Sequence, residues 1–155
     1  MDQIVDGILR WFESSCSRHN ELAYSAAEDG RVPFVSADDI AAAAMAALIH
    51  ERSFNSDFVL TGSQAISYDE VAERISKRVG RTISHHRLSA GALGERYRAL
   101  GLGSVHAQML AAMDTAIAAG AEDRVTGCVE QLIGRPPIAF GAFVEANASE
   151  WYARS

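Results

Sequence analysis

The hydrophobic residues of this chain recur mostly at intervals of three and four positions, which places them along one face of an α-helix. In the first such segment, Ile4, Ile8 and Phe12 repeat every four residues. The pattern predicts helices over 3–18, 37–50, 68–79, 104–119 and 140–151, with a weaker one over 89–101 and a short one over 124–133. In the strong helix 104–119, the residues that we expect to face the core are Val105, Met109, Ala112, Met113 and Ala116.

Short runs rich in β-branched and aromatic residues lie between the earlier helices. We expect strands near 32–36, 57–61 and 82–88, and the sequence ELAYSA is a candidate for one more. Pro33 favours a sheet edge or a sheet entry for the first of these, because proline has no backbone N–H to donate. Helices dominate after Ser89, so the sequence predicts a helix-rich α/β protein.

Helix starts are marked by serine followed three residues later by an acid. Ser36 with Asp39 predicts an N-cap for the helix 37–50, and Ser67 with Glu70 forms a capping box at the next helix. Asp38 and Asp39 could be paired carboxylates for acid–base chemistry. Helix capping is the favoured interpretation, because acids near a helix N-terminus also interact favourably with its dipole.

Length and charge then restrict the class of protein. The chain has 155 residues, is 48% hydrophobic and carries a net charge of -6, which is typical of one globular domain and argues against nucleic acid or an anionic membrane as a partner. No apolar run approaches the about 18 residues needed to span a bilayer. The N-terminal sequence MDQIVDGILRWF lacks the basic region of a signal peptide, and Cys16 and Cys128 suggest no disulfide framework. We therefore expect a cytoplasmic protein.

Familiar chemical motifs are absent from the sequence. There is no glycine-rich dinucleotide fingerprint after a strand, no P-loop, no Tyr-x-x-x-Lys pair and no metal-ligand spacing among the five histidines. His85 and His86 are adjacent on an expected strand, so they should point to opposite faces, one buried and one solvated. The sequence therefore predicts no metal site and no complete cofactor site.

Four motifs nevertheless occur in the order and spacing of one known family: FVSADDIA, LTGSQAISYDEVA, GR-x-I before HHRLS, and GRPP-x-x-F-x-x-F. Over about 8–151 the chain resembles the C-terminal half of NmrA-like atypical short-chain dehydrogenases/reductases. Within them it is most similar to the ergot-alkaloid-biosynthesis-type reductases related to agroclavine dehydrogenase and festuclavine synthase. ILRWF resembles a family Leu-Arg-Pro-x-x-Phe segment, except that the proline is missing and the phenylalanine comes sooner.

The resemblance implies the C-terminal part of an NAD(P)-binding Rossmann-like fold. We expect a single domain over 1–155, in which 1–89 would flank a nucleotide-binding sheet and 90–155 form a helical, substrate-side region. The glycine-rich fingerprint of the family would lie upstream of Met1. NAD(P) is therefore the implied cofactor, but we expect the chain alone to bind NAD(P)H weakly or not at all, because no glycine-rich helix start is present to receive the pyrophosphate.

Two functions remain open. In the first, the chain is the substrate-binding half of an NAD(P)-dependent oxidoreductase for a small organic substrate, inactive by itself. The resemblance and the aromatic content suggest a pocket walled by Trp11, Phe12, Phe34, Tyr97, His106 and Met109. Each of these residues could instead be ordinary core. In the second, the chain is a non-catalytic binding or interaction module that forms a homodimer.

The helix 37–50 bears on the question of partners. Its apolar face is unusually wide, because a second row of residues extends it sideways: Ile40, Ala44, Ala47 and Leu48 form the first row, and Ala41, Met45 and Ile49 the second. We expect such a surface to be covered by a second copy of the chain or by a nucleotide-binding half. The predicted contact lies on the helix 37–50 or on the helix 3–18.

Overall fold

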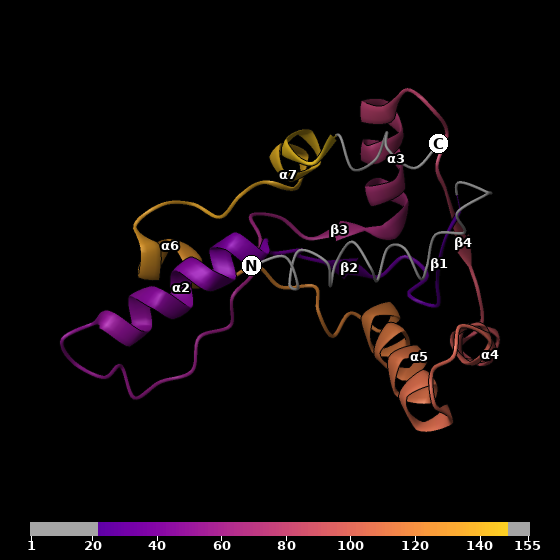
Figure 1. Ribbon diagram of the computed structural model, residues 1–155, viewed down its shortest axis with the longest axis horizontal. Coiled ribbons are helices and arrows are strands. Elements are labelled where there is room, and N and C mark those ends of the chain that lie inside the picture. The colour runs from indigo at the N-terminus through magenta and orange to yellow at the C-terminus, as the bar shows by residue number, and fades with distance from the viewer. Residues whose placement is uncertain (1–21, 149–155) are drawn as a thin grey trace.

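A computed structural model of the chain describes residues 22–148 (Figure 1). Its elements in chain order are β1 (Leu22–Ser25), β2 (Arg31–Val32), α2 (Ala37–Ile49), β3 (Ile66–Ser67), α3 (Tyr68–Val79), β4 (Ser84–Arg87), α4 (Ala90–Ala99), α5 (Ser104–Ala118), α6 (Cys128–Ile133) and α7 (Phe140–Ala146). This order confirms the predicted helix-rich α/β fold. The predicted helix 3–18 and the end of the predicted helix 140–151 lie outside the described residues.

The strands of the described region form two small sheets. β1 pairs in parallel with β4, with Ser25 opposite Arg87, and β2 pairs antiparallel with β3. The strand candidate ELAYSA and the predicted strand 82–88 are thereby confirmed. The predicted strand 32–36 is shorter than expected and ends at Val32, because Pro33 has no N–H with which to continue the ladder.

The predicted strand 57–61 is wrong, because these residues form no strand. Single hydrogen bonds hold the segment instead: Thr126 N donates to Thr61 Oγ1 over 2.9 Å, and Gly62 N donates to the Pro33 carbonyl over 2.9 Å. A Cβ atom on Gly62 would lie 2.0 Å from the Phe34 carbonyl oxygen. Residues 57–61 therefore belong to a loop that lies close to the loop after β2.

The predicted helix starts are confirmed in atomic detail. Ser36 Oγ accepts a hydrogen bond from Asp39 N over 3.0 Å at the start of α2. At α3, Ser67 Oγ accepts from Glu70 N over 3.2 Å, while Glu70 Oε2 accepts from Ser67 N over 2.7 Å. α3 ends at Gly80, whose left-handed φ of 71° suits a residue without a side chain. Local sequence therefore accounts for where both helices begin and for where α3 ends.

Two hydrophobic clusters cover the two faces of β1. Ala23 belongs to the first cluster, around α3 and α7, and Tyr24 packs against the second, around α4 and α5. Figure 1 shows α3 and α7 on one side of the strands and α4 and α5 on the other. The largest side chains of the first cluster are Ile66, Ile75 and Ile83, with Phe34, Phe140 and Phe143 against them; those of the second are Leu93 and Tyr97.

The predicted core face of α5 is wrong. Val105, Met109 and Met113 are exposed, and the buried positions of this helix are Ala107, Ala111 and Asp114. The physical reason is the close approach of α4, where a Cβ on Gly94 would lie 3.9 Å from the Cβ of Ala111. Small side chains permit this approach, so the long apolar side chains are turned outward.

One buried carboxylate of α2 helps to attach this helix to the rest of the fold. The Asp39 side chain is completely buried, and its Oδ2 accepts a hydrogen bond from Ile138 N over 2.7 Å. Its Oδ1 lies 2.8 Å from Nη1 of Arg135. Asp39 therefore does more than stabilise the helix start, because it fixes the segment between α6 and α7 against α2.

The rest of α2 is largely open to solvent. Met45, Leu48 and Ile49 are exposed, with Leu48 at 85%, and Ile40 is at the border of exposure. The wide apolar surface predicted for this helix is therefore present in the described part of the chain. No helix between residues 22 and 148 has the length and apolar character needed to cross a membrane.

We predict that Asp39→Ala lowers the free energy of unfolding by about 2–4 kcal/mol, because it leaves the Ile138 N–H without its acceptor and Arg135 without its counter-ion. Urea denaturation followed by circular dichroism measures the change. The matched control is Asp38→Ala, in which an exposed acid of the same helix turn is lost, and its cost should stay below about 1 kcal/mol. Equal losses in the two variants would contradict the role assigned to Asp39.

Candidate functional site

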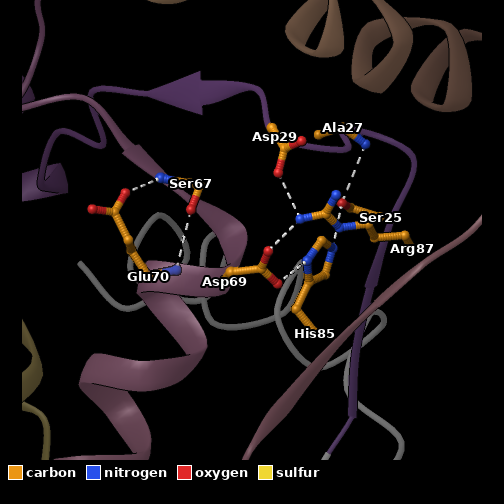
Figure 2. Close-up of polar contacts among 8 residues, drawn as sticks. All are labelled: Ser25, Ala27, Asp29, Ser67, Asp69, Glu70, His85 and Arg87. Carbon is orange, nitrogen blue, oxygen red and sulfur yellow. Dashed lines mark hydrogen bonds and ion pairs between the residues drawn. The ribbon is translucent and has the colours of Figure 1, made fainter.

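The carboxyl ends of the parallel strands β1 and β4 meet the first turn of α3 in a group of polar side chains (Figure 2). We call it the polar cluster, and it consists of Ser25, Asp29, Asp69, His85 and Arg87. The carboxyl edge of a parallel sheet is where α/β proteins usually bind ligands. This cluster is therefore the candidate functional site of the described region.

His85 lies at the centre of the polar cluster. Its side chain is completely buried, its Nε2 lies 2.7 Å from Ser25 Oγ, and its Nδ1 lies 2.8 Å from Asp69 Oδ1. An ionised carboxylate only accepts hydrogen bonds, so Nδ1 carries a proton and its N–H donates to Asp69. In the neutral imidazole, Nε2 then accepts the hydroxyl proton of Ser25, whose oxygen accepts the Ala27 N–H over 3.2 Å.

This order of atoms is the same as in the Ser-His-Asp triads of hydrolases. Ser25, however, is 0% exposed, so its hydroxyl is not accessible to an attacking or acylated substrate. The Ser25 hydroxyl is also already hydrogen-bonded, to His85 Nε2 and to the Ala27 N–H. The chain of hydrogen bonds therefore holds β1, β4 and α3 together and does not supply a nucleophile.

Arg87 forms the exposed side of the polar cluster. Its Nη2 lies 2.7 Å from Asp29 Oδ1 and 2.6 Å from Asp69 Oδ2, so it joins the loop after β1 to the first turn of α3. Partial burial raises the pKa of Asp69, but hydrogen bonds from Arg87 and His85 outweigh it and hold that pKa below its usual value. The two carboxylates in turn raise the pKa of Arg87. Asp69 is therefore ionised at neutral pH.

A second buried acid lies behind β1. Asp114 of α5 is 4% exposed, and its Oδ2 accepts a hydrogen bond from Ala26 N over 2.8 Å. Burial raises the pKa of Asp114, although this hydrogen bond and the nearby His85 lower it in part. Burial, together with Asp114 and Tyr97, also raises the pKa of the Tyr68 phenol. Tyr68 is thus a neutral side chain, with its ring 5.7 Å from that of His85.

The sequence-predicted pocket residues lie in several places. Phe34 packs in the first hydrophobic cluster with its ring 5.7 Å from Tyr68, while Tyr97 is buried in the second cluster. His106 and Met109 are exposed on α5, and Met109 is 52% exposed. Trp11 and Phe12 lie outside the described residues. The structure therefore brings Phe34 and Tyr97 near Tyr68 and leaves His106 and Met109 on the surface.

Sequence reasoning recognised only part of the polar cluster. The expectation of one buried and one solvated histidine is confirmed, because the side chain of His85 is buried and His86 is exposed. Ser25, Asp69 and Arg87 were missed as a site. The one local signal was the capping box, which places Asp69 in the first turn of α3, but the pairing of β1 with β4 is not visible in local sequence.

Metal binding finds no support in the described region. Between residues 22 and 148, no group of three or more histidine, cysteine, aspartate or glutamate side chains is arranged to hold a metal ion. The carboxylates of the polar cluster are instead paired with Arg87 and His85.

We predict that the polar cluster makes stability depend on acid pH through Asp69. Because the folded-state pKa of Asp69 is lowered, its ionisation stabilises the fold above the ordinary value of 3.8 and ceases to do so as the pH falls through the lower folded value. Urea denaturation between about pH 7 and pH 3 should show a steeper acid loss for the natural chain than for Asp69→Asn. The pKa of Asp114 is raised instead of lowered, but Asp114 is present in both proteins, so the comparison isolates the effect of Asp69. Parallel pH profiles would contradict this prediction.

Sequence comparison finds relatives among oxidoreductases. The chain is 38% identical over 143 residues to agroclavine dehydrogenase of Claviceps fusiformis, covering 92% of this chain and 50% of that protein. It is 36% identical over 149 residues to festuclavine dehydrogenase easG of Aspergillus fumigatus, with 95% and 51% covered. The chain thus spans about half the length of the curated relatives that it matches. No model of a known protein family matches the chain.

Solved structures show the same fold. The NADPH-dependent quinone oxidoreductase QOR2 of Escherichia coli, complexed with NADPH, matches with a TM-score of 0.76 at 21% identity, over 94% of this chain and 49% of that one. Triphenylmethane reductase of Citrobacter sp., complexed with NADP(H), matches with a TM-score of 0.72 at 23% identity, over 91% and 47%. The chain therefore corresponds to the C-terminal half of the proteins related to agroclavine dehydrogenase and festuclavine synthase, and its fold is that of the NmrA-like reductases.

Proposed function

We propose that this chain is the substrate-side half of an NAD(P)H-dependent oxidoreductase and acts on a small organic substrate together with a nucleotide-binding half. The observation that carries the proposal is the alignment of 92% of the chain with only 50% of a dehydrogenase. The polar cluster supports it, because hydrogen bonds and ion pairs fix the carboxyl ends of β1 and β4, the edge that faces ligands in α/β enzymes.

The starts of α2 and α3 do not fit a dinucleotide. A pyrophosphate needs free backbone N–H groups at a helix start. At α2 and α3, Ser36 and Ser67 already accept the third N–H of each helix, and two acids lie in each first turn. These acids would repel a phosphate. NAD(P)H is therefore expected to be held by the nucleotide-binding half, with hydride supplied from there.

The substrate is proposed to contact the exposed surface of α5. His106 and Met109 are exposed there beside Val105 and Met113, on the outer side of the α4–α5 pair. Methionine side chains adapt to differently shaped apolar partners. The names of the relatives suggest the classes to try, which are quinones, triphenylmethane dyes, azo compounds and alkaloids.

The test is co-expression of this chain with the part of Claviceps fusiformis agroclavine dehydrogenase that it does not match, followed by NADPH oxidation assays with those four classes. We predict that Met109→Ala raises KM about two- to tenfold for the accepted class while kcat changes little, because an apolar contact is lost from substrate and transition state alike. Met45→Ala on α2 is the matched control and should leave KM unchanged. Micromolar binding of NADPH by this chain alone would overturn the proposal.

A non-catalytic homodimer is the second candidate, and the exposed apolar surface of α2 favours it. Alanines between Met45 and Leu48 allow a second helix to approach closely, and a two-fold axis would bring the same surface of another copy against it. We predict that Leu48→Glu shifts a dimer toward monomer in sedimentation analysis, while Ser53→Glu in the exposed loop that follows does not. A monomer at high micromolar concentration in the unsubstituted chain would reject this candidate.

A further inference from the structure

The loop between β1 and β2, residues 26–30, lies against one side of α5. At its start, Ala26 N donates a buried hydrogen bond to Asp114 Oδ2 over 2.8 Å. At its end, a Cβ atom on Gly30 would lie 2.3 Å from the Ile117 carbonyl oxygen, so the missing side chain lets the two backbones come close. Asp114 and Ile117 are three positions apart and therefore share one side of the helix. The loop thus meets α5 at two separate points.

The same loop is bonded to the polar cluster. Ala27 N donates to Ser25 Oγ over 3.2 Å (Figure 2). Asp29 Oδ1 lies 2.7 Å from Nη2 of Arg87. Between these two contacts, Glu28 has a left-handed φ of 48°, which a residue with a side chain keeps only where its surroundings impose it. The loop is therefore a short, constrained connection between the polar cluster and α5.

The packing of α5 on α4 is of a different kind. There, Gly94 of α4 approaches the small side chain of Ala111, with 3.9 Å from its added Cβ to that of the alanine. Apolar contacts of this type are non-directional. The bond from Ala26 N to Asp114 is directional instead, and the buried N–H would be costly to leave without an acceptor. It is therefore suited to determine where α5 lies relative to the carboxyl end of β1.

We infer that Asp114 is a positioning residue, which holds α5 through the β1–β2 loop and so determines where the proposed substrate surface of this helix lies. The inference rests on the proposed function, in which the exposed side of α5 contacts the substrate. Asp114 is buried and Met109 is exposed, so Asp114 acts through the helix and not by touching substrate. Displacement of bound substrate by about 1 Å can cost about 100-fold in rate, so a small shift of α5 has a large effect.

The first test measures the position of α5 in the chain alone. The two natural cysteines are replaced by serine, and spin labels are attached through Glu73→Cys on α3 and Gln108→Cys on α5, both at exposed positions. Double electron–electron resonance should give one narrow distance distribution. Asp114→Ala should shift it or make it about twofold broader, because the directional attachment is lost. Asp114→Asn should restore the narrow distribution, because its amide oxygen can accept from Ala26 N.

A second variant changes the loop and leaves Asp114 in place. Gly30→Ala puts a Cβ atom against the Ile117 carbonyl, so it should displace α5 in the same measurement. The matched control is Gly91→Ala in α4, where a Cβ atom meets nothing within 4 Å, and it should leave the distribution unchanged. Circular dichroism confirms that each variant is folded, and if Asp114→Ala is not, Gly30→Ala and its control decide the question. An unchanged distribution in Gly30→Ala or in folded Asp114→Ala would overturn the inference.

The second test is the NADPH oxidation assay of the chain co-expressed with the unmatched part of Claviceps fusiformis agroclavine dehydrogenase. Asp114→Ala should lower kcat about tenfold without changing KM for NADPH, because the substrate is held away from the reacting geometry. Asp114→Asn should recover most of this loss, and equal losses in the two variants would contradict a positioning role. The distance measurements need neither cofactor nor the second half. A shift of α5 in a chain without any reductase activity would therefore fail the proposed function and leave the attachment of α5 by Asp114 standing.

Discussion

The buried imidazole of His85 is the interaction on which the arrangement of β1, β4 and α3 depends. A buried polar group without partners is costly, and this ring finds one partner on each of two other elements, Ser25 of β1 and Asp69 of α3. All three elements must therefore be in place together. A shift of β4 by one residue would turn His86 inward and His85 outward, so the same bonds also specify the strand register. Arg87 adds a second connection to Asp69 from the solvent side.

Small residues provide the second constraint, at the packing of α4 on α5. Tyr97 and Leu93 fill the second cluster from α4. The buried positions of α5 are Ala107, Ala111 and Asp114, and the partly buried Leu110 packs against the same cluster. A longer side chain at the alanine positions would hold the helices apart. Asp114 remains buried at the cost of a raised pKa, because it satisfies the Ala26 N–H at the end of β1. The polar cluster and the α4–α5 pair thus both converge on the carboxyl end of β1.

Local features of this fold were predictable, and non-local ones were not. The caps at Ser36 and Ser67 depend on residues three positions apart, so the sequence predicts them correctly. The core face of α5 was predicted wrongly, because apolar periodicity does not show that a close neighbour will select alanine over methionine. The polar cluster was missed for the same kind of reason, since Ser25 and His85 are 60 residues apart in sequence. Burial of one of two adjacent histidines was predictable, but the partners of the buried one were not.

The helix starts of this chain connect the fold to its proposed role. α2, α3 and α4 each begin with a serine whose oxygen accepts a backbone N–H of the first turn. In α2 and α3 the acids of that turn are further engaged, since Asp39 holds the segment before α7 and Asp69 holds His85 and Arg87. A helix start whose donors and charge are used in this way cannot also receive a phosphate. Anion binding must then come from helix starts other than those of α2 and α3, and a nucleotide-binding half would supply them in the division of labour that we propose between two halves.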